Sequence, residues 1–112
     1  MIFFEELVGD VVVLTVNLER ATIKNADEFK HRLVSIINKG YNKIVIDVSS
    51  CTFIDSSFLG VLVSILKRVV RLNGDLKLVG FQPAVRSMFE LTRMFRVFDT
   101  FSNKDEAVNS FK

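Results

Sequence analysis

The sequence predicts an α/β protein in which a mixed β-sheet of four or five strands carries about four helices, mainly on one face. Three observations predict this fold. First, two apolar stretches rich in β-branched residues open the chain. Second, short apolar runs then alternate with longer amphipathic stretches. Third, glycine, proline and asparagine lie at the boundaries between these segments. With 112 residues, 49% of them hydrophobic, we expect a single domain over residues 1–112.

The predicted strands differ in how their apolar residues are arranged. Residues 2–8 and 11–18 flank Gly9-Asp10, and a two-residue Gly-Asp connection between β-branched runs is typical of a hairpin. Nearly continuous apolar runs favour strands covered on both faces. Such strands are expected at 43–48 and 76–79, followed by a short last strand at Val97-Phe98.

Helix start and stop signals divide the rest of the chain. Asn25 is the candidate N-cap of a first helix that ends at Gly40, and Asp55 or Ser56 caps a second helix that ends at Asn73-Gly74. Pro83 opens a third helix, and residues 105–111 form a short last one. The residues expected to face inward are Leu59, Leu62, Val63, Leu66 and Val69 on the second helix and Val85, Met88, Phe89 and Leu91 on the third.

Composition and charge exclude several classes of function. The net charge of +2 is too small for a nucleic-acid-binding surface, and Cys51 has no second cysteine to pair with. Cysteine and histidine do not cluster in a way that predicts a metal site, and nothing predicts a cofactor. The apolar runs are too short to span a membrane, and the N-terminus lacks the pattern of a signal peptide. We therefore expect a cytoplasmic protein that binds neither nucleic acid nor a membrane.

The segment Ser49 to Gly60 is the most informative part of the sequence, because it leaves a buried strand and enters a helix. Ser56 is predicted at the helix start, where unpaired N–H groups and the helix dipole stabilise an anion. A phosphate on Ser56 would add a charge of about −1.5 to −2 without unfolding the domain. Asp and Ser are also preferred N-caps, so a purely structural role for this loop stays open at this point.

Two groups of residues carry a resemblance to a known family. The loop Asp55, Ser56, Ser57, Phe58, Leu59 and Gly60 is followed by a strand and then by a helix with Pro83, Val85, Phe89 and Leu91. Loop and downstream order together resemble the second half of the STAS domain found in bacterial anti-sigma-factor antagonists. The resemblance implies a STAS-like mixed sheet and agrees with the predicted element order along the full chain.

The resemblance also implies a function without catalysis. The unphosphorylated antagonist binds an anti-sigma factor that is itself a serine kinase, and so frees the sigma factor. Phosphorylation of the serine after the Asp, here Ser56, breaks the complex, and a phosphoserine phosphatase restores it. The residues that the resemblance assigns to partner binding are Asp55, Ser57, Phe58, Leu59, Gly60, Thr22 and Asn25.

Three positions depart from the family pattern. Phe58 stands where the family has Gly after the second hydroxyl residue. An aromatic ring at an exposed helix start would either contact the partner or hinder a kinase, and we expect Phe58 to contribute to partner binding. Thr22 takes the place of an Asp before the first helix, where a Gly is also missing. Arg93 replaces a Gly near the end of the third helix.

Several other residues allow different interpretations. Asp47 ends a strand as a receiver-domain phosphoacceptor does, but only one acid lies near the end of the preceding strand, so Asp47 is expected to accept loop hydrogen bonds instead. His31 is expected on the surface rather than in a hydrolase triad. The basic strip Lys67, Arg68 and Arg71 is expected to be solvated or, less favoured, to meet an acidic partner. Phe53 and Phe95 are further candidates for exposed anchors.

The alternative function is a ligand-binding or scaffolding STAS-like domain in which Ser56 is only a helix cap.

Overall fold

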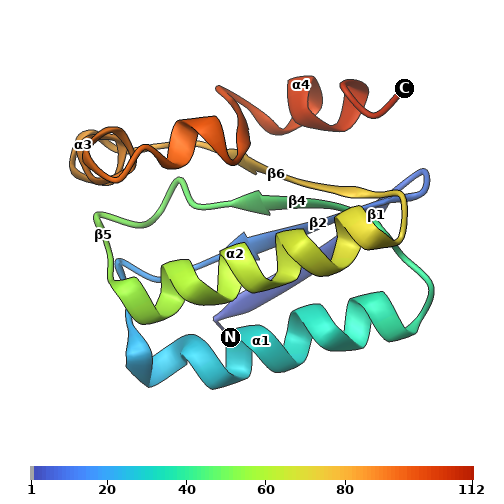
Figure 1. Ribbon diagram of the computed structural model, residues 1–112, viewed down its shortest axis with the longest axis horizontal. Helices are drawn as coiled ribbons and strands as arrows, with labels where there is room; N and C mark the ends of the chain where they lie inside the picture. The colour runs from blue at the N-terminus through green and yellow to red at the C-terminus, as the bar shows by residue number, and fades with distance from the viewer. Residues whose placement is uncertain (1) are drawn as a thin grey trace.

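A five-stranded mixed sheet forms the centre of the computed structural model, which describes residues 2–112. The strand order is β1-β2-β4-β6-β7, and only the β1–β2 pair is antiparallel (Figure 1). The bounds are β1 Phe3–Val8, β2 Val11–Val16, β4 Lys43–Asp47, β6 Asp75–Val79 and β7 Asp99–Phe101. This arrangement confirms the predicted mixed sheet and its opening hairpin, in which Val8 pairs with Val11 around Gly9-Asp10.

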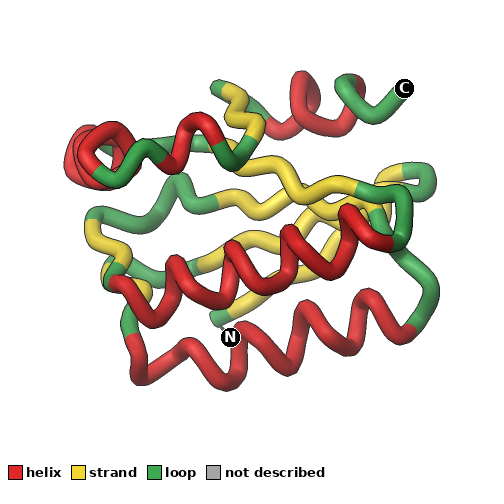
Figure 2. The backbone as a smooth tube through the Cα atoms, viewed as in Figure 1, coloured by secondary structure: helices red, strands yellow, loops and turns green. Residues whose placement is uncertain are grey.

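Two long helices cover one face of the sheet and lie side by side (Figures 1 and 2). They are α1, Ile23–Asn38, and α2, Ser56–Arg71. Their buried residues recur at helical spacing, as expected for helices with one apolar face. The residues they bury in the main core are Phe29, Leu33, Ile36 and Ile37 from α1 and Phe58, Leu62, Ile65, Leu66 and Val69 from α2.

The start of α1 differs from the sequence prediction. The helix begins at Ile23, and Thr22 is its N-cap, with the Thr22 hydroxyl accepting the Lys24 N–H at 3.3 Å. The prediction that Asn25 is the cap is therefore wrong. Both residue types are good caps, and here Thr22 has the extended backbone that an N-cap requires.

The opposite face of the sheet is covered by the short helix α4, Lys104–Asn109. Val11, Val13, Val45 and Val79 from the strands pack there against Ala107 and Val108. This second, smaller core explains why the central strands are apolar on both faces. The two long helices share the other face, in agreement with the prediction that the helices pack mainly on one side.

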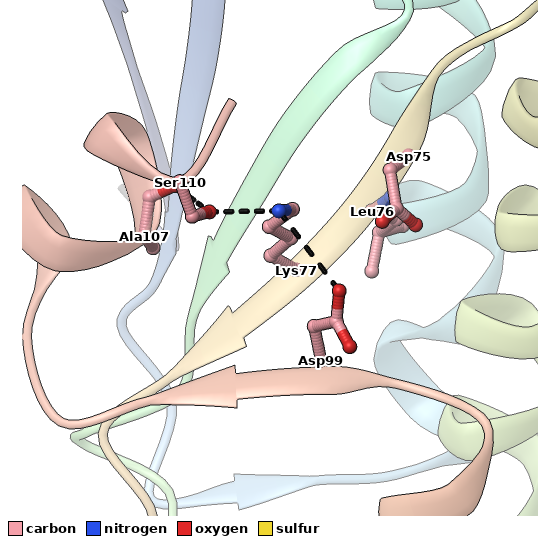
Figure 3. A network of polar contacts seen from close by, with 6 residues as sticks. All are labelled: Asp75, Leu76, Lys77, Asp99, Ala107 and Ser110. Atoms are coloured by element: carbon pink, nitrogen blue, oxygen red, sulfur yellow. Dashed lines mark hydrogen bonds and ion pairs between the residues drawn. The ribbon is translucent and has the colours of Figure 1, made fainter. Parts of the chain in front are cut away.

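Lys77 is a charged residue buried in this second core, with 7% of its surface exposed. Its ammonium donates to the Ser110 hydroxyl at 2.7 Å and lies 3.9 Å from the Asp99 carboxylate (Figure 3). It also lies 4.5 Å from the centre of the Phe111 ring. A lysine on β6 thus connects the sheet to the residues that follow α4.

The segment from α3 to β7 corrects two predictions. α3, Pro83–Leu91, starts with Pro83 as predicted, but Leu91 is 85% exposed and does not face inward. A 3₁₀ turn, η1 Met94–Arg96, follows, so the last strand begins at Asp99 rather than at Val97. Arg93 has φ of +60°, a left-handed conformation that favours glycine, which gives a physical reason for the family's Gly at this position.

A separate two-stranded sheet was not predicted. β3, Arg20–Ala21, pairs in parallel with β5, Phe53–Ile54. Because β3 leads into α1 and β5 leads into α2, this small sheet brings the starts of the two long helices together.

Candidate functional site

Hydrogen bonds fix the two helix starts against each other. The Thr52 N–H donates to the Glu19 carbonyl at 2.8 Å, and the Asp55 N–H donates to the Ala21 carbonyl at 3.0 Å. These bonds lie on either side of the paired residues of β3 and β5 and extend the pairing to Asp55, the N-cap of α2. The chain before α1 and the loop before α2 therefore form one surface, although about 30 residues separate them in the sequence.

Both carboxylate oxygens of Asp55 are used in holding this surface. Asp55 is the N-cap of α2, where its Oδ1 accepts the Phe58 N–H at 2.9 Å. Its Oδ2 accepts the N–H of Ile23, the first residue of α1, at 2.8 Å. One side chain thus satisfies a free N–H at the start of each long helix, a favourable position for a negative charge.

Ser56 is the first residue of α2, and it is exposed. Asp55 supplies the cap, so the Ser56 hydroxyl is not needed for that role. Ser57 is half-buried beside it. A hydroxyl at an exposed helix N-terminus can be modified without disturbing the cap, and a phosphate there would lie near the positive end of the helix dipole.

Phe58 lies in the core and not on the surface. It has no exposed area, and its ring stacks on that of Phe29 with 4.1 Å between centroids and 10° between planes. Phe29 in turn stacks on Phe3 at 5.5 Å. The expectation that Phe58 is an exposed contact for a partner is therefore wrong. The sequence signal that identifies its position is the spacing Phe58, Leu62, Ile65 and Val69, which continues the buried stripe of α2 to its first turn.

The exposed apolar groups at the site are Ile23 and Phe53. Ile23 is 69% exposed and Phe53 is 40% exposed. The Arg20 guanidinium lies over the Phe53 ring, 4.3 Å from its centre. Sequence reasoning named Phe53 among three aromatic candidates but missed Ile23, since an isoleucine at a helix start gives no signal of exposure.

The other predicted site residues lie at or near the two helix starts. Thr22, Asn25 and Leu59 are half-buried, whereas Gly60 is exposed on the outer side of α2. Phe95 is also half-buried, with its ring against Phe81 and Phe89. Several exposed residues lie at or next to the small sheet. Among them are Arg20, Ile23, Phe53 and Ser56, and we call these four the Ser56 surface.

The structure also places the reactive side chains Cys51, Asp47 and His31. Cys51 is fully buried, and burial followed by the nearby charge of Asp47 raises the pKa of its thiol to about 12. Asp47 accepts the Ser49 N–H at 2.9 Å, as expected for a loop-forming aspartate. His31 is exposed on α1. Within residues 2–112, no three His, Cys, Asp or Glu side chains come together as metal ligands would.

Comparison with known proteins assigns the chain to a family. The STAS domain family matches residues 6–107. The chain belongs to the STAS domain family. A protein of Thermotoga neapolitana, provisionally named as an anti-sigma factor antagonist, is 39% identical over 107 residues, which cover 92% of this chain and 94% of that protein. The predicted family resemblance is thereby confirmed.

Solved STAS structures show the same fold. The crystal structure of a provisionally assigned anti-sigma factor antagonist from Thermotoga maritima has 36% sequence identity and a TM-score of 0.90, covering 96% of this chain and 92% of that one. The phosphorylated form of the Bacillus cell fate determinant SpoIIAA has 18% identity and a TM-score of 0.76, covering 98% and 99%. At 18% identity, the similarity to SpoIIAA shows a shared fold and nothing more.

No helix in the described part of this STAS chain combines the length and apolar character that crossing a bilayer requires.

Proposed function

We propose that this STAS domain is an anti-sigma factor antagonist whose attachment to a kinase-type anti-sigma factor is switched by phosphorylation of Ser56. The domain acts in the cytoplasm as a binding protein without catalytic activity of its own, and a phosphoserine phosphatase reverses the modification. The observation that carries the proposal is the division of roles in the loop: Asp55 caps α2 and also accepts the Ile23 N–H at the start of α1, while the adjacent Ser56 hydroxyl is exposed.

The Ser56 surface supports docking of a partner in the unphosphorylated state. Ile23 and Phe53 supply apolar area that is already accessible, and Arg20 is held in place by its contact with the Phe53 ring. Aromatic and arginine side chains are enriched among residues that dominate binding energy. The family relatives named as anti-sigma factor antagonists are consistent with this partner class.

A phosphate at Ser56 would act by charge and desolvation. It adds about −1.5 to −2 charge beside the Asp55 carboxylate and among the apolar groups of the Ser56 surface. A partner that covers Ile23 and Phe53 would have to bury that charge, which is costly unless it is paired. The fold tolerates the same charge because the start of α2 is a favourable place for an anion. SpoIIAA, which shares the fold, has been solved in a phosphorylated form.

The test combines mass spectrometry with a binding assay. The protein is incubated with ATP and a kinase-type anti-sigma factor from the same genome, and the modified residue is mapped. We expect one phosphate, on Ser56. Ser56→Ala should bind the kinase without being modified, and Ser56→Asp should bind at least about tenfold more weakly. Ser87→Ala, which removes an exposed serine of α3 outside the Ser56 surface, is the matched control and should still be modified.

Two results would contradict the proposal. One is an unmodified Ser56 in a chain that binds the active kinase. The other is unchanged binding of the Ser56→Asp variant, which would favour a ligand-binding or scaffolding role for this STAS domain.

A further inference from the structure

The outer side of α2 carries a basic strip that the Ser56 surface does not include. Lys67, Arg68 and Arg71 are all exposed, and α2 contains no acidic residue. Within residues 2–112, none of these three cations takes part in an ion pair, whereas Lys43, Lys77 and Lys104 do. The strip is thus a local excess of positive charge on a chain whose net charge is only +2.

A shallow hollow runs along the same side of the helix. Its volume is about 290 Å³, and it is lined by Gly60, Val63, Ser64, Lys67, Arg68 and Arg71. Each of these positions has another of them three or four residues away along the helix, so they form one continuous face. The small residues lie toward the N-terminal end of this face and the cations lie toward the C-terminal end.

Internal packing does not explain Gly60. A Cβ atom built there meets nothing within 4 Å, and glycine inside a helix costs about 0.5–1 kcal/mol relative to alanine. The helix dipole explains part of the strip, since Arg68 and Arg71 lie in the last turn. It explains neither the glycine nor the hollow that extends from Gly60 to the cations.

We propose that this face of α2 is a second docking surface, and that its occupant is an acidic helical segment of a partner protein. Carboxylates spaced three or four residues apart on such a helix would pair with Lys67, Arg68 and Arg71, while its backbone would approach α2 closely over Gly60 and Ser64. Charge complementarity selects an acidic partner. The partly apolar hollow, lined by Val63, favours a protein segment over nucleic acid or an anionic membrane.

The second surface is electrostatically separate from Ser56. Eleven residues of α-helix place Lys67 roughly 16 Å along the axis from Ser56, about twice the screening length at physiological ionic strength. A phosphate on Ser56 therefore leaves the basic strip largely unaffected. The strip would hold a partner in either phosphorylation state, while Ser56 decides whether the partner engages fully.

The experiment titrates the unphosphorylated, ¹⁵N-labelled full chain with a synthetic helical peptide of about 15 residues that carries three glutamates along one face. A second peptide has glutamine at those three positions. We expect chemical-shift changes at Gly60, Ser64, Lys67 and Arg71 with the first peptide, and binding at least about threefold weaker with the second. Raising the salt concentration from about 0.05 M to about 0.5 M should weaken binding further.

Variants make the assignment specific. The double variant Lys67→Glu with Arg71→Glu should lose the peptide. The control double variant, Arg96→Glu with Lys112→Glu, changes the net charge by the same amount at exposed positions outside α2. This control should still bind the peptide. A side chain at position 60 meets no neighbouring atom, so Gly60→Gln should fill the hollow without unfolding the domain. This variant should bind the peptide more weakly.

Three outcomes would overturn the proposal. The first is that the glutamate peptide changes chemical shifts on a face other than the outer side of α2. The second is that the glutamine peptide binds as tightly as the glutamate peptide. The third is binding of a short DNA duplex or of phosphatidylserine vesicles through the same residues when the peptide does not bind. Since the titration uses unmodified protein, its result does not depend on whether Ser56 is ever phosphorylated.

Discussion

The Asp55 carboxylate accepts the backbone N–H of Ile23 at 2.8 Å across 32 positions of sequence. The same carboxylate caps α2 through the Phe58 N–H, so one side chain holds the start of both long helices. The position of Ser56 relative to the exposed Ile23 side chain depends on this pair of bonds.

Replacement of Asp55 tests that dependence. Asp55→Ala removes both acceptors and should lower the free energy of unfolding by about 2 kcal/mol, whereas Asp55→Asn keeps one acceptor oxygen and should lose about half as much. Urea denaturation measures both values. Glu90→Gln, which changes an exposed acid on α3, is the control and should lie near the wild type. Equal stability of Asp55→Ala and this control would show that the double cap contributes nothing.

Phe58 and Phe53 should respond to substitution in opposite ways. Phe58→Ala removes a fully buried ring from the stack with Phe29 and should cost about 3–5 kcal/mol in unfolding free energy. Phe53→Ala removes a ring that is 40% exposed and should cost less than about 1 kcal/mol while weakening partner binding. Thermal unfolding and a binding titration separate the two effects. A Phe58→Ala protein as stable as the wild type would contradict the core position of this ring.

Cys51 makes stability depend on pH in the alkaline range. The folded pKa of about 12 lies above the ordinary value of 9.0, so the unfolded chain loses the thiol proton first. The stability due to the neutral thiol is complete below pH 9 and falls as the pH rises toward 12, by about 1 kcal/mol for each pH unit. Urea midpoints against pH should therefore fall more steeply for the wild type than for Cys51→Ala. Parallel curves for the two proteins would refute the assignment.

Lys77 offers a test of how a buried cation contributes to the fold. Its charge has one short hydrogen bond, to Ser110, and a distant partner in the mostly exposed Asp99. Lys77→Met keeps the volume of the stem and avoids burying a charge, so it should leave stability unchanged or raise it by up to about 2 kcal/mol. Lys77→Ala leaves a cavity beneath α4 and should lower stability by about 2 kcal/mol. If both variants lose the same amount, the charge itself rather than the packing of the stem holds α4.

Arg93 carries a backbone cost that glycine would relieve. A non-glycine residue in the left-handed region costs roughly 1 kcal/mol, and Arg93 has φ of +60° after the last turn of α3. Arg93→Gly should therefore raise the urea midpoint, while Arg93→Ala, which keeps a Cβ atom, should not. A gain with alanine equal to that with glycine would assign the effect to the arginine side chain instead.

Sequence reasoning identified the elements that have a long periodic pattern or a strong boundary signal. The hairpin around Gly9-Asp10, the Pro83 helix and the Asp55 cap belong to this group. The β3–β5 pairing could not be read from the sequence, because two-residue strands have no periodicity and their partner is distant. This pairing is also what assembles the Ser56 surface.

The errors at the site have local causes. Thr22 and Asn25 are both good caps, and backbone geometry rather than residue type decides between them. The expectation that Phe58 is exposed rests on its place at the start of α2 beside Ser56. In this chain the ring stacks on Phe29, which stacks on Phe3, so this departure from the family pattern contributes to the core.

The pairing of β3 with β5 has a consequence for molecular recognition. Arg20 and Ile23 reach the neighbourhood of Ser56 only once the chain before α1 has hydrogen-bonded to the loop before α2. A short synthetic copy of residues 49–60 would present the serine but only part of its surroundings. An enzyme or partner that recognises these side chains together would therefore act on native protein and not on nascent or denatured copies, so the proposed phosphorylation of Ser56 would be confined to folded molecules.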